Sequence, residues 1–230
     1  MLKLENVHAF YGKSHILHGV SLEVGEGEVV GILGRNGVGK TTTMKSIIGL
    51  VERKGLIEFN GRDISKLPPY RIARLGIGYV PQGRMIFPEL TVMENLLVGT
   101  KEEKPEILKE IFDLFPRLEE RKTQIAGTLS GGEQQMLAIA RALMLEPKLI
   151  LMDEPTEGLM PIMVSRIKEV VQEINERGVS VLLVEQNAKM ALDTVERVYI
   201  MEKGMIKYHS SAEDLKQNHE VLVRYLGVKA

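Results

Sequence analysis

Apolar and polar positions in the first part of the chain follow the period of β-strands and then change to the period of a helix. Residues 2–11 and 20–33 read as strands, and the second stretch is divided by Gly-Glu-Gly at residues 25–27. It ends in the continuous apolar run VVGIL at residues 29–33. Such a run is typical of a strand with both faces covered. We therefore expect the strand at 29–33 to be buried on both faces.

A glycine-rich turn at residues 34–39 follows this strand and leads into a helix with apolar positions between 43 and 48. Residues 55–59, followed by Asn60-Gly61, predict a hairpin, because Asn-Gly readily adopts the conformation that tight β-turns need. The order in this part is therefore strand, phosphate-type loop and helix.

The strand pattern fades between residue 84 and about residue 146. Two segments in this stretch, TVME at 91–94 and SGGE at 130–133, match the Ser/Thr-x-x-Glu capping box that begins a helix. We expect residues 84–146 to form a helical subdomain inserted in one domain that spans residues 1–230.

Strands and helices alternate again toward the C-terminus. Residues 149–152 and 179–184 read as strands around a helix with apolar positions at 167–174. A hairpin around Lys203-Gly204 and a helical tail to Ala230 follow. This alternation predicts an α/β fold with a mostly parallel sheet and helices on its faces.

Composition narrows the classes of function. The 230 residues, 44% of them hydrophobic, can bury a substantial core, and the formal charge of −1 gives no positive field for a nucleic-acid backbone. Without cysteine, disulfides and thiolate metal sites are excluded. No uncharged apolar stretch approaches the roughly 18 residues of a membrane helix, and residues 1–5 lack the apolar segment of a signal peptide. We expect no nucleic-acid partner, and a chain that neither spans a membrane nor is exported.

The segment GRNGVGKT at residues 34–41 matches the Gly-x4-Gly-Lys-Ser/Thr phosphate loop, between a buried strand and a helix. Glycines let backbone N–H groups turn toward phosphates, and the helix N-terminus adds partial positive charge. In such a loop Lys40 bridges the β- and γ-phosphates, and the Thr41 hydroxyl ligates Mg²⁺. The alternative is a glycine-rich turn before an ordinary helix.

The strand at 149–152 is followed by two carboxylates, Asp153 and Glu154. Ligands of α/β folds lie at the carboxyl edge of the parallel sheet. At that edge Asp153 can hold Mg²⁺ through its water shell, and Glu154 can polarise an attacking water as general base. Alone, paired acids after a strand are more often a solvated turn, and the phosphate loop upstream reverses that preference.

The segment LSGGEQ at residues 129–134 predicts a second anion site. Its capping-box serine and two glycines expose free N–H groups at a helix start. One nucleotide does not need two such sites from one molecule, so Ser130, Gly131 and Gly132 are interpreted as serving a nucleotide held by another subunit. A plain helix cap does not explain the two glycines, which lower helix stability unless the backbone must approach something closely.

With these motifs in this order and spacing, the chain resembles the ABC (ATP-binding cassette) ATPases over essentially its whole length. The segment at 129–134 resembles the signature that is highly specific to that family. The resemblance implies a P-loop NTPase core with a mostly parallel sheet flanked by helices, an antiparallel β subdomain and a helical subdomain. It also implies ATP and Mg²⁺ as ligands, and a second ATPase subunit, identical or not, that completes each ATP site.

The resemblance assigns roles to individual residues. Tyr11 matches the aromatic residue that stacks on adenine, and Gln82 matches the glutamine that contacts Mg²⁺ or the attacking water and senses the membrane subunit. The catalytic residues it implies are Glu154, Gln186, Gln82 and Lys40, and the metal ligands are Thr41, Gln82 and Asp153. The nucleotide-binding residues it implies are Tyr11, Gly34, Arg35, Asn36, Gly37, Val38, Gly39, Lys40, Thr41, Thr42, Ser130, Gly131 and Gly132.

Two positions depart from the family pattern. Gln186 stands where most relatives have a histidine that touches the γ-phosphate, and glutamine can donate a hydrogen bond but cannot take a proton. Met160 stands where the usual loop offers an aspartate to the opposite subunit. The side chain for that polar contact between subunits is therefore missing.

Both departures, with FPRL at 115–118, AGTL at 126–129 and Gly83-Arg84, are similar to the ATPases of branched-chain amino-acid importers. Similar sequences serve urea or short-amide uptake. The resemblance implies transmembrane permease subunits as partners, a periplasmic or extracellular substrate-binding protein as an indirect one, and a place at the cytoplasmic face of the membrane.

Two other classes remain as alternatives. A soluble ABC protein that acts on ribosomes or DNA usually carries two cassettes in one chain, whereas this chain has one cassette and a charge near zero. A switch GTPase needs the guanine-reading sequence Asn-Lys-x-Asp, which this chain lacks.

Overall fold

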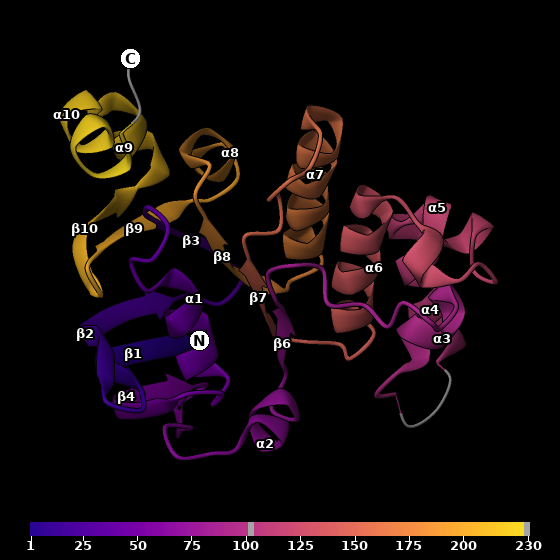
Figure 1. The fold of residues 1–230 in the computed structure, drawn as a ribbon, viewed down its shortest axis with the longest axis horizontal. Coiled ribbons are helices and arrows are strands. Elements are labelled where there is room, and N and C mark those ends of the chain that lie inside the picture. Colours follow the sequence, from indigo (N-terminus) through magenta and orange to yellow (C-terminus); the bar gives the residue numbers. More distant parts are fainter. Residues whose placement is uncertain (101–103, 228–230) are drawn as a thin grey trace.

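A six-stranded sheet lies at the centre of the fold (Figure 1). The computed structural model describes residues 1–100 and 104–227. The strand order is β10-β9-β3-β8-β7-β6, and all neighbours are parallel except β10 and β9. The strands are β3 (Val29–Leu33), β6 (Ile77–Val80), β7 (Leu149–Asp153), β8 (Ser180–Glu185), β9 (Arg197–Glu202) and β10 (Met205–Ser211). The predicted mostly parallel sheet and the hairpin around Lys203-Gly204 are thus confirmed.

A second, antiparallel sheet lies at one end of the molecule (Figure 1). Its order is β2 (Ser14–Val24), β1 (Leu2–Tyr11), β4 (Glu52–Phe59) and β5 (Arg62–Asp63). The predicted hairpin at Asn60-Gly61 is present, with Phe59 opposite Arg62. β2 begins earlier than the predicted residue 20, because residues 14–18 pair with the end of β1.

Helices pack against both faces of the central sheet. The described helices are α1 (Lys40–Ile47), α2 (Pro69–Ala73), α3 (Val92–Leu97), α4 (Pro105–Leu114), α5 (Pro116–Glu120), α6 (Gly131–Leu143), α7 (Pro161–Glu176), α8 (Ala188–Leu192), α9 (Ala212–Gln217) and α10 (His219–Val221). Short turns of other helix types are η1 (Ala126–Thr128) and η2 (Leu222–Leu226). The predicted C-terminal tail is helical in α9, α10 and η2, and its last residues, 228–230, lie outside the described part. No helix in residues 1–100 and 104–227 has the length and apolar character of a membrane span.

The stretch predicted to be helical, residues 84–146, contains α3, α4, α5, η1 and α6. Both predicted capping boxes are present. The Thr91 side chain accepts a hydrogen bond from the backbone N–H of Glu94, and the Ser130 side chain accepts one from the backbone N–H of Glu133. In turn, the carboxylate of each glutamate accepts a hydrogen bond from the backbone N–H of its cap residue. These helices lie on the side of the molecule opposite the antiparallel sheet (Figure 1).

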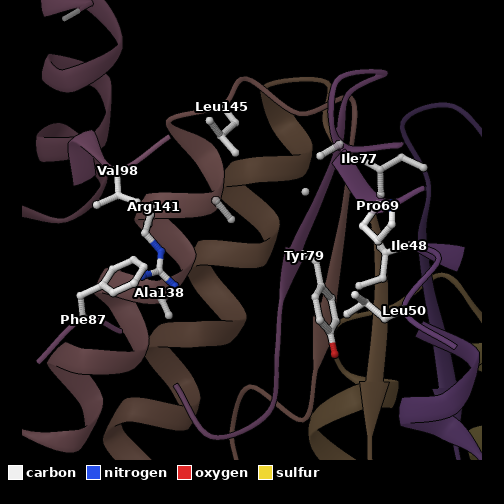
Figure 2. Close-up of a pocket in the computed structure, with 13 residues that line it drawn as sticks. Ile48, Leu50, Pro69, Ile77, Tyr79, Phe87, Val98, Ala138, Arg141 and Leu145 are labelled. Carbon is white, nitrogen blue, oxygen red and sulfur yellow. The ribbon is translucent and has the colours of Figure 1, made fainter. Parts of the chain in front are cut away.

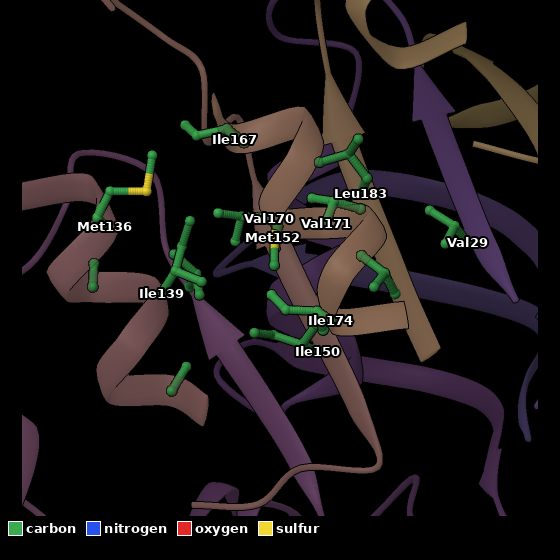
Figure 3. Packing of buried hydrophobic residues seen from close by; sticks show 14 of the residues in the cluster. Val29, Met136, Ile139, Ile150, Met152, Ile167, Val170, Val171, Ile174 and Leu183 are labelled. Atoms are coloured by element: carbon green, nitrogen blue, oxygen red, sulfur yellow. The ribbon is translucent and has the colours of Figure 1, made fainter. Parts of the chain in front are cut away.

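The central strands divide their side chains between two apolar cores. On β3, Val29 and Leu33 belong to the core with α6 and α7, whereas Val30 and Ile32 belong to the core with α1 and the antiparallel sheet. Figure 3 shows the first core, where Ile150 and Met152 of β7 face residues of α7. Burial on both faces of β3 is therefore confirmed, and its end is held firmly where the phosphate-type loop begins.

Candidate functional site

The glycine-rich loop between β3 and α1 packs closely on the chain around it. A Cβ atom on Gly34 would lie 2.5 Å from the backbone oxygen of Met201, and Gly39 has a φ of 114° that side-chain-bearing residues rarely adopt. Both positions therefore require glycine. The loop wraps the end of Lys40, whose Nζ donates to the backbone oxygens of Gly34 at 2.8 Å and Arg35 at 3.1 Å.

Lys40 also forms a buried ion pair with Glu154, with Nζ 3.0 Å from Oε1. Glu154 follows β7 with a φ of 48°, in the left-handed region, while its N–H donates to the oxygen of Val184. A non-glycine residue held in this region stores strain, which concentrates at functional sites. The backbone thus directs this carboxylate into the phosphate loop instead of toward solvent.

Oxygen atoms of Thr41 and Asp153 meet beside this pair. The Thr41 hydroxyl donates to Oδ1 of Asp153 at 3.1 Å, and the Tyr79 hydroxyl donates to Oδ2 at 3.2 Å. Two ligands on neighbouring corners of a Mg²⁺ octahedron lie about 3 Å apart when each bond is 2.0–2.1 Å. The oxygen donors and their spacing therefore fit Mg²⁺, with Thr41 and Asp153 as the residues that can hold it.

The electrostatics of Asp153 favour a cation. Burial raises the pKa of the Asp153 carboxyl, and hydrogen bonds from Thr41 and Tyr79 oppose the rise. Burial and the charge of Asp153 together raise the pKa of the Tyr79 hydroxyl, so this group remains protonated at neutral pH. A fully buried carboxylate is stabilised when a metal ion or another positive charge lies against it.

Gln82 reaches the same site from the segment after β6. Its Nε2 donates to Glu157 Oε2 at 2.8 Å and lies 3.5 Å from Glu154 Oε2. The amide thus contacts the base candidate and the loop after β7 at once. A shift of the segment that carries Gln82 would change the surroundings of Glu154.

Part of this group of residues lines a cavity of about 220 Å³, whereas the predicted residues Gly34, Arg35, Val38 and Asp153 lie beside it and do not line it. Its lining consists of Ile16, Asn36, Gly37, Gly39, Lys40, Thr41, Thr42, Gln82 and Glu154. The structure therefore brings together eight of the residues expected at the nucleotide, from the phosphate loop, the segment after β6 and the end of β7. Ile16 was not among the predicted residues.

Other predicted residues lie outside this cavity. Tyr11, at the end of β1, is 46% exposed, and Gln186, directly after β8, is exposed and makes no side-chain hydrogen bond to a described residue. Met160 is 68% exposed. Ser130, Gly131 and Gly132 begin α6, and none of the three lines the cavity. That a second subunit brings Ser130, Gly131 and Gly132 to the nucleotide stays a prediction.

The two glycines of the 129–134 segment have a structural reason within the chain. A Cβ on Gly131 would lie 2.7 Å from Nη1 of Arg84, and one on Gly132 would lie 2.6 Å from Cε of Met163. The expectation that a plain cap leaves the glycines unexplained is therefore incomplete, because side chains of the same molecule approach the backbone here.

Sequence reasoning gave no role to three polar residues of the site. Tyr79 lies within the quoted segment before Gln82, and Glu157 follows the acidic strand. Glu185 is buried, and its Oε1 accepts hydrogen bonds from the Thr156 backbone at 3.2 Å and hydroxyl at 2.7 Å. The available signal concerned Glu185, which ends the parallel strand β8, where a ligand site is expected.

An apolar groove of about 330 Å³ lies between α6 and β6 (Figure 2). Leu50, Phe87, Val98 and Leu145 are exposed along it. The Arg141 guanidinium lies 4.9 Å from the centre of the Phe87 ring, and its Nη1 is buried without a hydrogen-bond partner in the described part of the chain. An exposed apolar surface of this kind is suited to binding a partner segment.

A family model described as "ABC transporter" matches residues 17–157. The chain is 45% identical over 232 residues to the high-affinity branched-chain amino acid transport ATP-binding protein BraG of Pseudomonas aeruginosa, covering 99% of this chain and 100% of BraG. It is 39% identical over 235 residues to the lipopolysaccharide export system ATP-binding protein LptB of Haemophilus influenzae, covering 99% and 97%.

Among solved structures, the chain is similar to the dimeric, post-hydrolysis state of the ATP-binding cassette MJ0796 bound to ADP and Pi. The TM-score is 0.82 at 28% identity, and the match covers 92% of this chain and 99% of the other. The antiparallel sheet, the mostly parallel sheet and the helices around them thus form an arrangement seen in a nucleotide-bound cassette.

Proposed function

The chain belongs to the ABC transporter family, as an ATP-binding subunit whose ATP hydrolysis is coupled to transport, and we propose that it drives an importer of branched-chain amino acids. The observation that carries the proposal of ATP hydrolysis at this site is that Lys40, Thr41 and Glu154 line one cavity, with Asp153 hydrogen-bonded to Thr41 beside it. The name of BraG supports the substrate class.

In this proposal the phosphate loop binds the phosphates of ATP through its backbone N–H groups and Lys40. Glu154 accepts a proton from the attacking water, and Gln82 orients that water beside it. Thr41 and Asp153 hold Mg²⁺, which neutralises charge on the phosphates. Tyr11 stacks on adenine.

We propose that two cassettes pair into a closed assembly, and the dimeric structure of the MJ0796 cassette supports the pairing. In our proposal Ser130, Gly131 and Gly132 of one subunit bind the γ-phosphate of the ATP held by its partner, and Gln186 contacts that phosphate within its own subunit. ATP stabilises the closed pairing, and hydrolysis removes that stabilisation. The cycle thereby converts nucleotide free energy into motion.

Cassettes of this family work with transmembrane permeases, and we propose the apolar groove as the place where a permease segment docks. An apolar segment would cover Leu50, Phe87 and Val98, which are exposed along the groove. The groove also contains Tyr79, which precedes Gln82 by three residues. The protein would therefore lie at the cytoplasmic face of the membrane, with a substrate-binding protein on the other side.

The similarity to LptB supports a second substrate class, lipopolysaccharide export, at lower identity. The test is to co-express the chain with the permease and substrate-binding protein of a branched-chain amino-acid importer, and to measure ATP-dependent uptake of labelled leucine into vesicles. Lys40→Ala in the same complex is the control. Leucine uptake that requires Lys40 supports the proposal. A complex that hydrolyses ATP but moves urea or lipopolysaccharide, and no leucine, would contradict the substrate class alone.

A further inference from the structure

Tyr79 faces two functional regions at once. Its ring lies in the apolar groove between the α6 wall and the wall formed by Ile48 and Leu50 (Figure 2). Its hydroxyl, at the far end of the same side chain, donates to Oδ2 of Asp153 at 3.2 Å. No other residue that lines the groove hydrogen-bonds to Asp153 in the described part of the chain.

The strand register explains this reach. β6 pairs in parallel with β7, with Tyr79 opposite Leu151, so Asp153 lies two residues further along the neighbouring strand. A long side chain that leans along the strand can span this offset, and the tyrosine hydroxyl ends at the carboxylate. A shorter or apolar residue at position 79 would line the groove without touching Asp153.

The two oxygens of Asp153 are each held by one hydroxyl. Thr41 holds Oδ1 on the phosphate-loop side, and Tyr79 holds Oδ2 on the groove side. The pair of hydrogen bonds fixes the rotation of the carboxylate about its bond to Cβ. Without the Tyr79 hydroxyl, the structure offers Oδ2 no other side-chain donor among the described residues, so Oδ1 would lose its fixed direction toward Thr41.

From this geometry we propose that Tyr79 is a positioning residue that joins the partner-docking groove to the metal-holding carboxylate Asp153. The inference rests on the proposed function, in which Asp153 holds Mg²⁺ and the groove receives a permease segment. A segment seated against the ring restricts its motion and thereby stabilises the orientation of Asp153. An empty groove leaves the ring, and with it the carboxylate, freer to move.

The first test compares the full wild-type chain with Tyr79→Phe, which keeps the ring and removes only the hydroxyl. Affinity for a fluorescent non-hydrolysable ATP analogue is measured in excess EDTA and over a titration with Mg²⁺. We expect equal affinities in EDTA. We expect the variant to need about a tenfold higher Mg²⁺ concentration for half-maximal analogue binding, the usual effect of losing a hydrogen bond to a metal ligand. The EDTA measurement also checks that the variant is folded.

Tyr70→Phe is the matched control, because Tyr70 is 56% exposed and its hydroxyl has no hydrogen-bond partner in the described part of the chain. It should behave as wild type. A Tyr79→Phe variant with wild-type Mg²⁺ dependence would overturn the inference alone. A wild-type chain that fails to bind the analogue would overturn the proposed function, and this inference with it.

The second test concerns the groove. The chain contains no cysteine, so Leu50→Cys provides a single thiol in the groove that a bulky maleimide can modify. We expect modification to lower the Mg²⁺ concentration for half-maximal analogue binding when Tyr79 is present, because a group seated against the ring stabilises the orientation of Asp153. In the Tyr79→Phe background we expect this concentration to stay unchanged. An equal shift in both backgrounds, or none in either, would overturn the connection through Tyr79.

Discussion

Lys40 and Glu154 form an ion pair whose side chains are only 3% and 7% exposed, with Nζ 3.0 Å from Oε1. The cation that should bind phosphate is thus paired with the carboxylate that should activate water. An incoming phosphate competes with Glu154 for Lys40, and once it binds, the carboxylate is free to contact water. The pair therefore makes distinct predictions for its two members.

For Glu154→Gln we expect tighter ATP binding and a loss of turnover of about a hundredfold or more, the scale of a general base. The neutral amide releases Lys40 to the phosphates but cannot take a proton. Titration calorimetry with Mg-ATP, phosphate release and size-exclusion chromatography measure the three expected effects: higher affinity, slow hydrolysis and accumulated ATP-bound dimers. Glu176→Gln at the exposed end of α7 is the control. Wild-type turnover with only monomers would show that Glu154 is not the base.

Lys40→Ala should lose affinity for ATP and also destabilise the nucleotide-free chain. The substitution leaves the buried Glu154 carboxylate without its partner, and breaking a buried pair costs about 3–5 kcal/mol. The double variant Lys40→Ala with Glu154→Gln should recover most of the stability but none of the affinity. Urea denaturation and calorimetry separate the two quantities. Unchanged affinity in the single variant would contradict the role of Lys40.

Several elements were predictable because one local pattern determines each of them. The apolar run of β3, the two capping boxes and the phosphate loop carry their signals within a few neighbouring residues. β6, at Ile77–Val80, is short and contains a glycine, so no strand was predicted there. It becomes a strand through pairing with β7, a contact between residues far apart in sequence.

The candidate site likewise combines features set by a local sequence pattern with contacts between residues far apart in sequence. Eight of the motif residues line one cavity, whereas the Tyr79–Asp153 hydrogen bond depends on the register between two strands. The packing of Arg84 and Met163 against the glycines of α6 likewise depends on tertiary structure. Spacing along the chain contains no information on such contacts.

Glu185 provides a prediction on pH and stability. Burial, with a contribution from the charge of Glu154, raises the pKa of the Glu185 carboxyl above the usual 4.5. The folded state therefore binds this proton more strongly than the unfolded state. This contribution to stability is fully present below pH 4.5 and is lost as the pH rises through the folded pKa.

Glu185→Gln removes this ionisation while an amide oxygen can still accept from Thr156. The Tm of the variant relative to wild type should therefore increase as the pH is raised from about 4.5. Each kcal/mol shifts the Tm of a domain of this size by about 2–4 °C, so scanning calorimetry without nucleotide can measure the difference. Glu176→Gln should show no such trend. A difference that stays constant with pH would mean that Glu185 titrates normally.

Gln186 carries the last prediction, because glutamine here replaces a group that could titrate. It follows Glu185 at the end of β8, exposed and outside the cavity of the single chain. If it reaches the γ-phosphate in the closed dimer, Gln186→Ala should lose about 1–3 kcal/mol of transition-state stabilisation, the range for a hydrogen bond to a charged group. Gln186→His should keep activity and add a limb to the rate profile near pH 6.5, whereas the wild type should show no ionisation from this position between about pH 6 and 8. Steady-state ATPase rates of the three proteins over that range, with the membrane partners present, test the assignment. An alanine variant as active as wild type would mean that Gln186 only ends the strand, and that Glu154, Lys40 and Ser130 carry catalysis without it.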